Sequence, residues 1–217
     1  VDPHIVACLH AGFAAGAIVY YSASLFLEQK GAAVRYVTQF REYALARKKA
    51  DASERIKLLA ADLADGEGID RLGAAIGARW GRLDVLVINA AMLGPLTPVP
   101  HGDPKEVAEL FALNVLAPQR LLRACDPWLR AAPQARVIAL TSSVAAAPRA
   151  YWGLYGASKA ALEAMMLAYA DELANVSRVR VAVLNPGATA TAMRARAYPG
   201  EDAATLKSPE VVAMRIV

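Results

Sequence analysis

The sequence predicts one α/β domain, a doubly wound parallel sheet of about six strands with helices on both faces. Short runs of wholly apolar residues alternate with helical patterns along the chain. Strands that are buried on both faces have this continuous apolar character, and right-handed crossovers place helices over the sheet. No internal repeat or long low-complexity linker divides the 217 residues, so residues 1–217 are expected to form a single domain.

The expected elements follow from these runs. The expected strands are Ile5–Leu9, Ala33–Thr38, Ile56–Ala60, Val85–Ile88, Val137–Thr141 and Val179–Leu184. The expected helices are Ala17–Lys30, Phe40–Ala50, Gly68–Trp80, Pro104–Arg130 with a break near Asn114, and Trp152–Ala174. Ser208-Pro209-Glu210 predicts a last helix start, because Ser caps it, Pro suits the first turn and Glu complements the dipole. Ala188–Leu206 has no clear period and is expected to be a mobile loop over the site.

Composition narrows the function. Hydrophobic residues make up 56% of the chain, and the net charge is +4 with both signs mixed. No array of basic and aromatic residues indicates a nucleic-acid partner. Two cysteines, Cys8 and Cys125, are too few for a disulfide framework and fit a reducing, cytoplasmic location. No metal site is expected.

The segment Ile5–Leu27 has two interpretations. Its 23 residues contain no Asp, Glu, Lys or Arg, which is long enough for a membrane helix, and Gly12 and Gly16 form a G-x-x-x-G pattern. However, His10 and several Tyr and Ser residues interrupt the run. We therefore expect a buried strand, a glycine turn and a core helix, and no membrane partner. A signal peptide is disfavoured because no basic segment precedes the run.

Tyr155 and Lys159 form the first candidate site. Residues four apart on a helix project from the same face, so the ammonium can lie near the phenol oxygen. A positive charge there favours phenolate, which brings the pKa of the tyrosine closer to neutral and makes it a general acid/base. A single Tyr-x-x-x-Lys pattern also arises by chance on solvated helices.

Further polar residues follow the predicted strands in a fixed order. They are Asn89 after Val85–Ile88, Ser142 and Ser143 after Val137–Thr141, and Asn185-Pro186-Gly187 with Thr189 and Thr191 after Val179–Leu184. Asn114 lies within a helical pattern between the first two groups. Ser143 precedes Tyr155 by twelve residues.

From about Leu58 to Met193, these motifs resemble the short-chain dehydrogenase/reductase family. The resemblance implies a Rossmann-type fold and a catalytic tetrad of Asn114, Ser143, Tyr155 and Lys159, with Ser142 as the alternative to Ser143. It also implies a nicotinamide cofactor, NADP or NAD. The residues implied to bind it are Gly12, Gly16, Asp62, Asn89, Ala90, Tyr155, Lys159, Pro186, Gly187, Thr189 and Thr191.

The chain departs from the family pattern at the cofactor turn. The family motif is T-G-x-x-x-G-x-G; Gly12 and Gly16 keep its spacing, but Ala11 replaces the Thr and Ile18 the third glycine. A branched side chain at that position should push the helix away from the strand. In the family's N-A-G turn, Ala91 replaces the glycine. No carboxylate lies between Val34 and Arg41 to repel a 2′-phosphate, which favours NADP over NAD.

The resemblance implies an oxidoreductase that interconverts a secondary alcohol and a ketone by hydride transfer. Tyr155 would exchange the hydroxyl proton, Lys159 would lower the pKa of Tyr155, and Ser143 would donate to the carbonyl oxygen. Asn114 would hold a water near Lys159, and Thr191 would hold the carboxamide. The altered glycine turn leaves the alternative of a non-catalytic relative with weak or no cofactor binding.

The substrate and assembly are expected as follows. Pocket walls from Met92, Leu93, Ala145–Trp152 and Met193 are mostly apolar and favour a small apolar alcohol or ketone. The family resemblance implies a homodimer or homotetramer formed by the two long helices that flank the serine strand.

Overall fold

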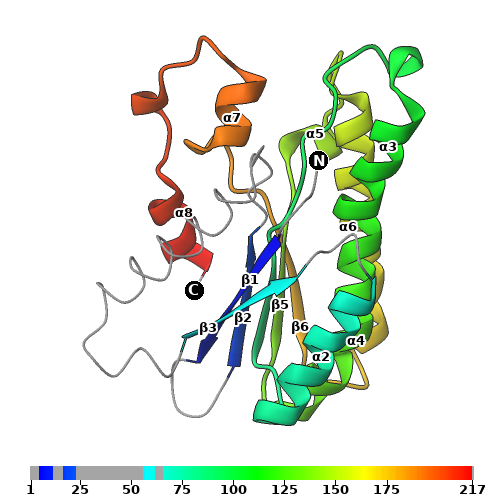
Figure 1. The fold of residues 1–217 in the computed structure, drawn as a ribbon, viewed down its shortest axis with the longest axis vertical. Helices are drawn as coiled ribbons and strands as arrows, with labels where there is room; N and C mark the ends of the chain where they lie inside the picture. Colours follow the sequence, from blue (N-terminus) through cyan, green and yellow to red (C-terminus); the bar gives the residue numbers. More distant parts are fainter. Residues whose placement is uncertain (1–4, 12–16, 23–55, 62–65, 217) are drawn as a thin grey trace.

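The structure is a computed structural model, and it describes residues 5–11, 17–22, 56–61 and 66–216 (Figure 1). Six strands form one sheet in the order β3-β1-β2-β4-β5-β6. They are β1 (Ile5–Ala11), β2 (Ala17–Ser22), β3 (Ile56–Ala61), β4 (Val85–Ile88), β5 (Arg136–Leu140) and β6 (Arg180–Leu184). The expected strand Ala33–Thr38 and helix Phe40–Ala50 lie outside the described residues.

The first half of the sheet differs from the prediction. Ala17–Ser22 is a strand, not the start of a helix over Ala17–Lys30, and it pairs antiparallel with β1. The segment Ile18-Val19-Tyr20-Tyr21 is β-branched and aromatic, residue types that favour strands, and a run this short does not distinguish helix from strand. Because β1 is also antiparallel to β3, the sheet is mixed and not wholly parallel. No helix in the described ranges is both long and apolar enough to cross a membrane.

The second half of the sheet is parallel, as predicted. β2, β4, β5 and β6 run in one direction, with Ile88 opposite Ala139 and Leu140 opposite Leu184. The backbone N–H of Thr141 donates to the Leu184 carbonyl at 2.9 Å, which extends this ladder past the end of β5. The carboxyl ends of β4, β5 and β6 therefore meet at one edge, where ligands bind in open α/β sheets.

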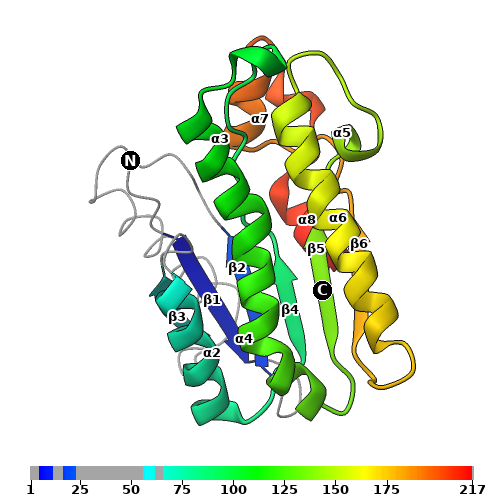
Figure 2. The same ribbon diagram turned by 90° about the vertical axis from the view of Figure 1, so that its right-hand side faces the viewer.

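Three helices cover one face of the sheet (Figures 1 and 2): α2 (Gly66–Trp80), α4 (Ala117–Ala131) and α6 (Gly153–Leu173). Helix α8 (Pro209–Ile216) lies on the other side of the sheet in Figure 1. It begins at Pro209 as predicted, and the Ser208 hydroxyl accepts from the N–H of Val211. The core between the sheet and α2, α4 and α6 contains Ile69, Ile76, Leu86, Leu121, Cys125, Val137, Leu162 and Met166.

The predicted break near Asn114 is a π-helical turn. α3 (Pro104–Phe111) begins at Asp103, whose side chain accepts from the N–H groups of Lys105 and Glu106. The turn η3 (Ala112–Leu116) follows, and α4 continues from it. Such wide turns are frequent at functional sites. Here the turn contains Asn114, whose side chain is completely buried.

Helix α6 begins at a constrained backbone position. Tyr151 has φ of +67°, a left-handed conformation that costs a non-glycine residue about 1–2 kcal/mol. Trp152 follows as the cap residue of α6, and its carbonyl accepts from the N–H of Gly156 at 2.7 Å. Gly156 in turn lies against α5 (Ser143–Ala146), because a Cβ there would come within 2.8 Å of the Val144 carbonyl oxygen.

Candidate active site

Tyr155 and Lys159 lie together on α6, beside the end of β5. Their residues are 6% and 3% exposed, so both are almost removed from solvent. The Lys159 ammonium donates to the Leu140 carbonyl at 3.0 Å and lies 6.0 Å from the centroid of the Tyr155 ring. The helical spacing therefore places the two side chains next to each other, as predicted.

The protonation of this pair differs from the expectation. Burial raises the pKa of Tyr155 to about 12, and a hydrogen bond with Ser142 offsets part of that rise. Burial also lowers the pKa of Lys159 to about 8, because a charged ammonium loses its hydration there. The expected shift of the Tyr155 pKa toward neutral is therefore wrong for this structure, because desolvation by burial outweighs the hydrogen bond with Ser142. At neutral pH Tyr155 is a phenol, which is a proton donor.

The two candidate serines separate at the end of β5. Ser142 has an extended backbone, with φ of −147°, and its side chain hydrogen-bonds Tyr155. Ser143 is the first residue of α5 and is exposed. The structure thus brings the alternative residue, Ser142, to the phenol.

Asn114 has structural partners on two other segments. Its Oδ1 accepts from the N–H of Met92 at 2.8 Å, and its Nδ2 donates to the Met92 carbonyl at 2.9 Å and to the Ser158 hydroxyl at 2.9 Å. Ser158 in turn donates to the Tyr155 carbonyl at 2.8 Å. Asn114 therefore connects the segment after β4 to α6 through its own side chain. The sequence gives no local signal for Ser158.

The expected cofactor residues of the described segments lie at the carboxyl edge of the sheet. Asn89 and Ala90 directly follow β4, and Ala90 is buried. After β6, Gly187 has φ of +69°, and its N–H donates to the Asn185 side chain at 3.0 Å. Gly12, Gly16 and Asp62 lie outside the described residues.

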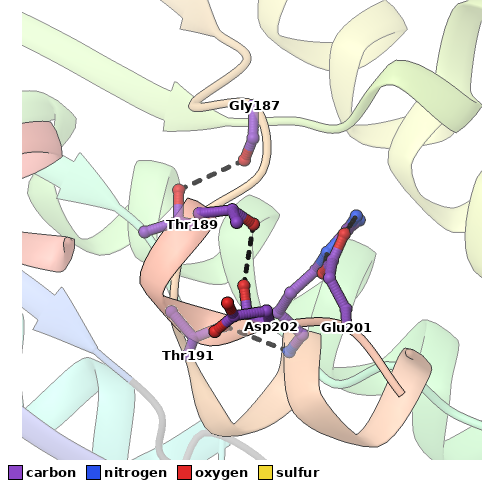
Figure 3. Close-up of polar contacts among 7 residues, drawn as sticks. Gly187, Thr189, Thr191, Glu201 and Asp202 are labelled. Atoms are coloured by element: carbon purple, nitrogen blue, oxygen red, sulfur yellow. Dashed lines mark hydrogen bonds and ion pairs between the residues drawn. The ribbon is translucent and has the colours of Figure 1, made fainter. Parts of the chain in front are cut away.

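The segment after Gly187 uses its threonine hydroxyls locally (Figure 3). Thr189 donates to the Gly187 carbonyl at 3.2 Å, and the Thr191 hydroxyl accepts from the N–H of Arg194 at 3.2 Å. Thr191 thereby caps α7 (Ala192–Ala197), which the sequence had indicated only as loop. Each hydroxyl can make a further hydrogen bond, so these contacts do not prevent cofactor binding.

Four of the expected wall residues, Met92, Leu93, Trp152 and Met193, belong to one apolar cluster with Tyr155. The rest of the expected wall segment Ala145–Trp152 lies outside this cluster, and residues 146–151 are exposed. Buried Leu93, Leu110 and Val144 belong to the cluster, and partly buried residues of other segments pack against it: Met92, Leu96, Phe111, Trp152, Leu154, Met193 and Ala197. Within the described residues, no group of His, Cys, Asp or Glu is arranged to bind a metal ion. The site therefore combines a buried proton donor, a buried cation and an apolar surround.

The family model of the short chain dehydrogenases matches residues 14–202. The chain belongs to this family. Membership confirms the resemblance drawn from the motifs, together with the Rossmann-type α/β fold.

Individual short-chain dehydrogenases show how far the similarity extends. YciK, an uncharacterized oxidoreductase of Escherichia coli K12, is 39% identical over 143 residues, which are 66% of this chain and 56% of that protein. A benzil reductase of Saccharomyces cerevisiae that forms (S)-benzoin is 30% identical over 138 residues, 61% of this chain and 52% of that protein. The chain thus spans about half the length of these curated relatives.

A solved structure extends the comparison to the fold. A putative short chain dehydrogenase from Escherichia coli CFT073, crystallised with NADPH, has a TM-score of 0.66 and 38% identity. The match covers 70% of this chain and 62% of that one.

Proposed function

We propose that this chain is an oxidoreductase that uses NADP or NAD to interconvert a ketone and a secondary alcohol. The observation that carries the proposal is the buried Tyr155 phenol, which hydrogen-bonds Ser142 and lies beside the buried Lys159 ammonium. In the described part of the chain no carboxylate pairs with Lys159. Burying an unpaired lysine lowers stability, so a structural role does not account for it. Proton transfer at an oxygen atom accounts for both residues.

The described residues fit a nicotinamide dinucleotide. A Lys ammonium has three N–H donors, and the one acceptor found for it in the described part of the chain is the Leu140 carbonyl. The other two N–H groups suit the hydroxyls of a ribose. Asn89 and Ala90 on one side, and Pro186, Gly187, Thr189 and Thr191 on the other, would hold the nicotinamide half. Gly12 and Gly16 are proposed for the pyrophosphate, and Asp62 for the adenine.

The cofactor would supply the hydride, and the protein would manage the proton. In the reductive direction, the O–H bond of Tyr155 breaks and its proton passes to the substrate oxygen as negative charge develops there. Ser142 fixes the position of the phenol oxygen and can donate to the same substrate oxygen. The Lys159 ammonium stabilises the tyrosinate that results, because an opposite charge nearby favours the ionised form. In the oxidative direction, the tyrosinate accepts the hydroxyl proton of the alcohol.

Asn114 takes a positioning role in this proposal in place of the water contact first expected. Its three hydrogen bonds hold Met92 and Ser158, which belong to the pocket wall and to the catalytic helix. Ser142 takes the role first assigned to Ser143, because it is the serine that contacts Tyr155.

The substrate, assembly and location are part of the same proposal. The apolar cluster around Tyr155 favours a substrate with an apolar body, and benzil, an aromatic diketone, is a suitable probe. Leu116 in η3 and Leu167 on α6 are 54% and 63% exposed, which supports a homodimer or homotetramer through the helices flanking β5. Two cysteines, one of them the buried Cys125, suit a cytoplasmic enzyme.

A cofactor titration tests the proposal. NADPH and NADH are added separately to the purified chain, and the melting temperature and nucleotide fluorescence are followed. We expect a shift with at least one of them, and a stronger one with NADPH. No shift with either at millimolar concentration would contradict the proposal, and binding without turnover of any ketone would favour a non-catalytic relative.

A further inference from the structure

The segment between β6 and α8 is held closed at its base. We call residues 188–207 the strap; it contains α7 and the short helix η4 (Ala203–Thr205). The N–H of Ala190 donates to the Lys207 carbonyl at 2.8 Å, and Thr189 and Lys207 form a parallel bridge. The Lys207 ammonium donates to the Pro186 carbonyl at 2.9 Å. These contacts fix both ends of the strap without using its tip.

We call residues 194–201 the tip of the strap. Arg194 makes the contacts that hold these residues together. The Arg194 Nε and Nη2 atoms each lie 2.6 Å from a carboxylate oxygen of Glu201. The guanidinium carbon also lies 3.7 Å from the centroid of the Tyr198 ring, a cation–π contact. Arg194 thus links α7 to Tyr198 and Glu201 and gives the tip a defined shape.

Trp152 connects this tip to the catalytic tyrosine. Its ring centroid is 5.6 Å from that of Tyr198, with a tilt of 30° between the planes. On the Tyr155 side the centroids are 6.0 Å apart and the rings meet edge to face, at 69°. Both separations lie in the range of favourable aromatic pairs. Aromatic contacts therefore run without interruption from the strap to the proton donor.

We propose that Trp152 is a positioning residue that couples the position of the strap to the orientation of the Tyr155 phenol. The inference rests on the proposed function, since it concerns the residue that transfers the proton. Met193 and Ala197 on α7 pack against the same apolar cluster as Tyr155, so a strap in place also keeps water from the phenol.

Removing the aromatic ring of Trp152 or of Tyr198, which contact each other, tests this coupling. We compare Trp152→Ala, Tyr198→Ala and the double variant in the reduction of benzil with NADPH, measuring kcat, KM and the NADPH dissociation constant. We expect each single change to lower kcat by about 10²-fold, because small misplacements of a reacting group have that effect. The double variant should lose no more than either single one, the NADPH dissociation constant should stay within about threefold, and Trp152→Phe should restore most of kcat.

The rate of trypsin cleavage reports how firmly the strap is held, and it does not depend on enzyme turnover. Cleavage after Arg196, an exposed residue of α7, should be faster in folded Trp152→Ala than in the unmodified chain. Trp80→Ala is the matched control, since Trp80 is a half-buried tryptophan on α2 with a cation–π contact to Arg79. It should change neither kcat nor the cleavage rate at Arg196.

Two results would overturn the coupling: additive losses of kcat, or equal cleavage rates at Arg196 in Trp152→Ala and Trp80→Ala. If the unmodified chain binds neither nucleotide and does not reduce benzil, the proposed function fails instead. In that case the cleavage rates alone decide whether Trp152 holds the strap.

Discussion

The side-chain amide of Asn114 makes the same pair of hydrogen bonds to Met92 that a neighbouring β-strand would make. It accepts from the Met92 N–H at 2.8 Å and donates to the Met92 carbonyl at 2.9 Å. The chain that leaves β4 thereby stays hydrogen-bonded after the sheet has ended. The third bond, to Ser158, extends this connection to the helix of Tyr155 and Lys159.

Replacing Asn114 should therefore lower stability strongly. Asn114→Leu has a similar volume but leaves both backbone groups of Met92 without their partner inside the protein. We expect the free energy of unfolding to fall by about 2–4 kcal/mol, measured by urea denaturation. Asn175→Leu is the control, because Asn175 is exposed and its replacement should change stability by less than about 0.5 kcal/mol. Equal effects of the two changes would show that the Asn114 bonds contribute little.

The two serines after β5 should behave differently. Ser142→Ala removes the hydroxyl that contacts Tyr155, and we expect kcat for benzil reduction to fall by about 10²–10³-fold, as for the loss of other oxygen-stabilising donors. Ser143→Ala, in an exposed position at the start of α5, should stay within about threefold. The opposite order of effects would return the catalytic role to Ser143.

Tyr155→Phe should remove turnover and leave cofactor affinity nearly unchanged. The change deletes the proton donor but keeps the ring, so the edge-to-face contact with Trp152 is preserved. NADPH affinity is measured by fluorescence titration beside the rate of benzil reduction. Substantial remaining activity would show that another group supplies the proton.

Lys159→Met should stabilise the protein at neutral pH. The pKa of Lys159 is lowered to about 8 in the folded protein, below its ordinary value of 10.5, because burial disfavours the ammonium. The free energy of unfolding therefore decreases as pH falls from 10.5 through 8, because the unfolded chain takes up the proton more readily. At pH 7 the folded protein contains a buried ammonium, which lowers its stability. We expect a gain of about 1–3 kcal/mol at pH 7 that shrinks as pH approaches 10.

A second lysine and the behaviour of Tyr155 provide controls for that measurement. Lys105→Met, at an exposed position, should change stability little at either pH. The pKa of Tyr155 is raised to about 12, so its effect on the pH dependence of stability is opposite to that of Lys159. The stability contributed by Tyr155 is complete below about pH 10 and is lost as pH rises toward 12. The comparison should therefore end near pH 10. A destabilised Lys159→Met at pH 7 would mean that the Leu140 contact outweighs the desolvation.

The rate of reduction should fall as pH rises through about 8. Above that value Lys159 loses its charge, and the tyrosinate formed by proton transfer loses its neighbouring cation. Tyr155 itself stays protonated over this range, since its pKa is raised to about 12. The measurement is kcat for benzil with NADPH between pH 6 and 9.5. A flat profile would contradict the role given to Lys159.

The parts of the fold that the sequence predicted well are those with continuous patterns. β4 is wholly apolar, β5 and β6 each consist of four apolar residues after an initial arginine, and α6 carries the Tyr155–Lys159 spacing. The sequence predicts a helix for Ala17–Ser22, but five apolar residues and a serine do not reveal a period, and pairing with β1 makes the segment a strand.

The details of the site depend on contacts that no local pattern contains. Ser142 and Ser143 are adjacent, and only the turn from β5 into α5 determines which one faces Tyr155. The partner of Asn114, Met92, is 22 residues away along the chain. The pKa of Tyr155 depends on how completely the fold buries it, which residue spacing does not report.

The π-helical turn of residues 112–116 also constrains how this family member can vary in length. Each residue of a helix advances the side-chain direction by about 100°. Loss of one residue from the turn would rotate α4 by that angle and carry Leu121 and Cys125 out of the core, while gain of one would do the reverse. Substitutions can accumulate on the solvent side of this segment, but insertions and deletions between α3 and α4 should be absent from every functional relative that shares the turn.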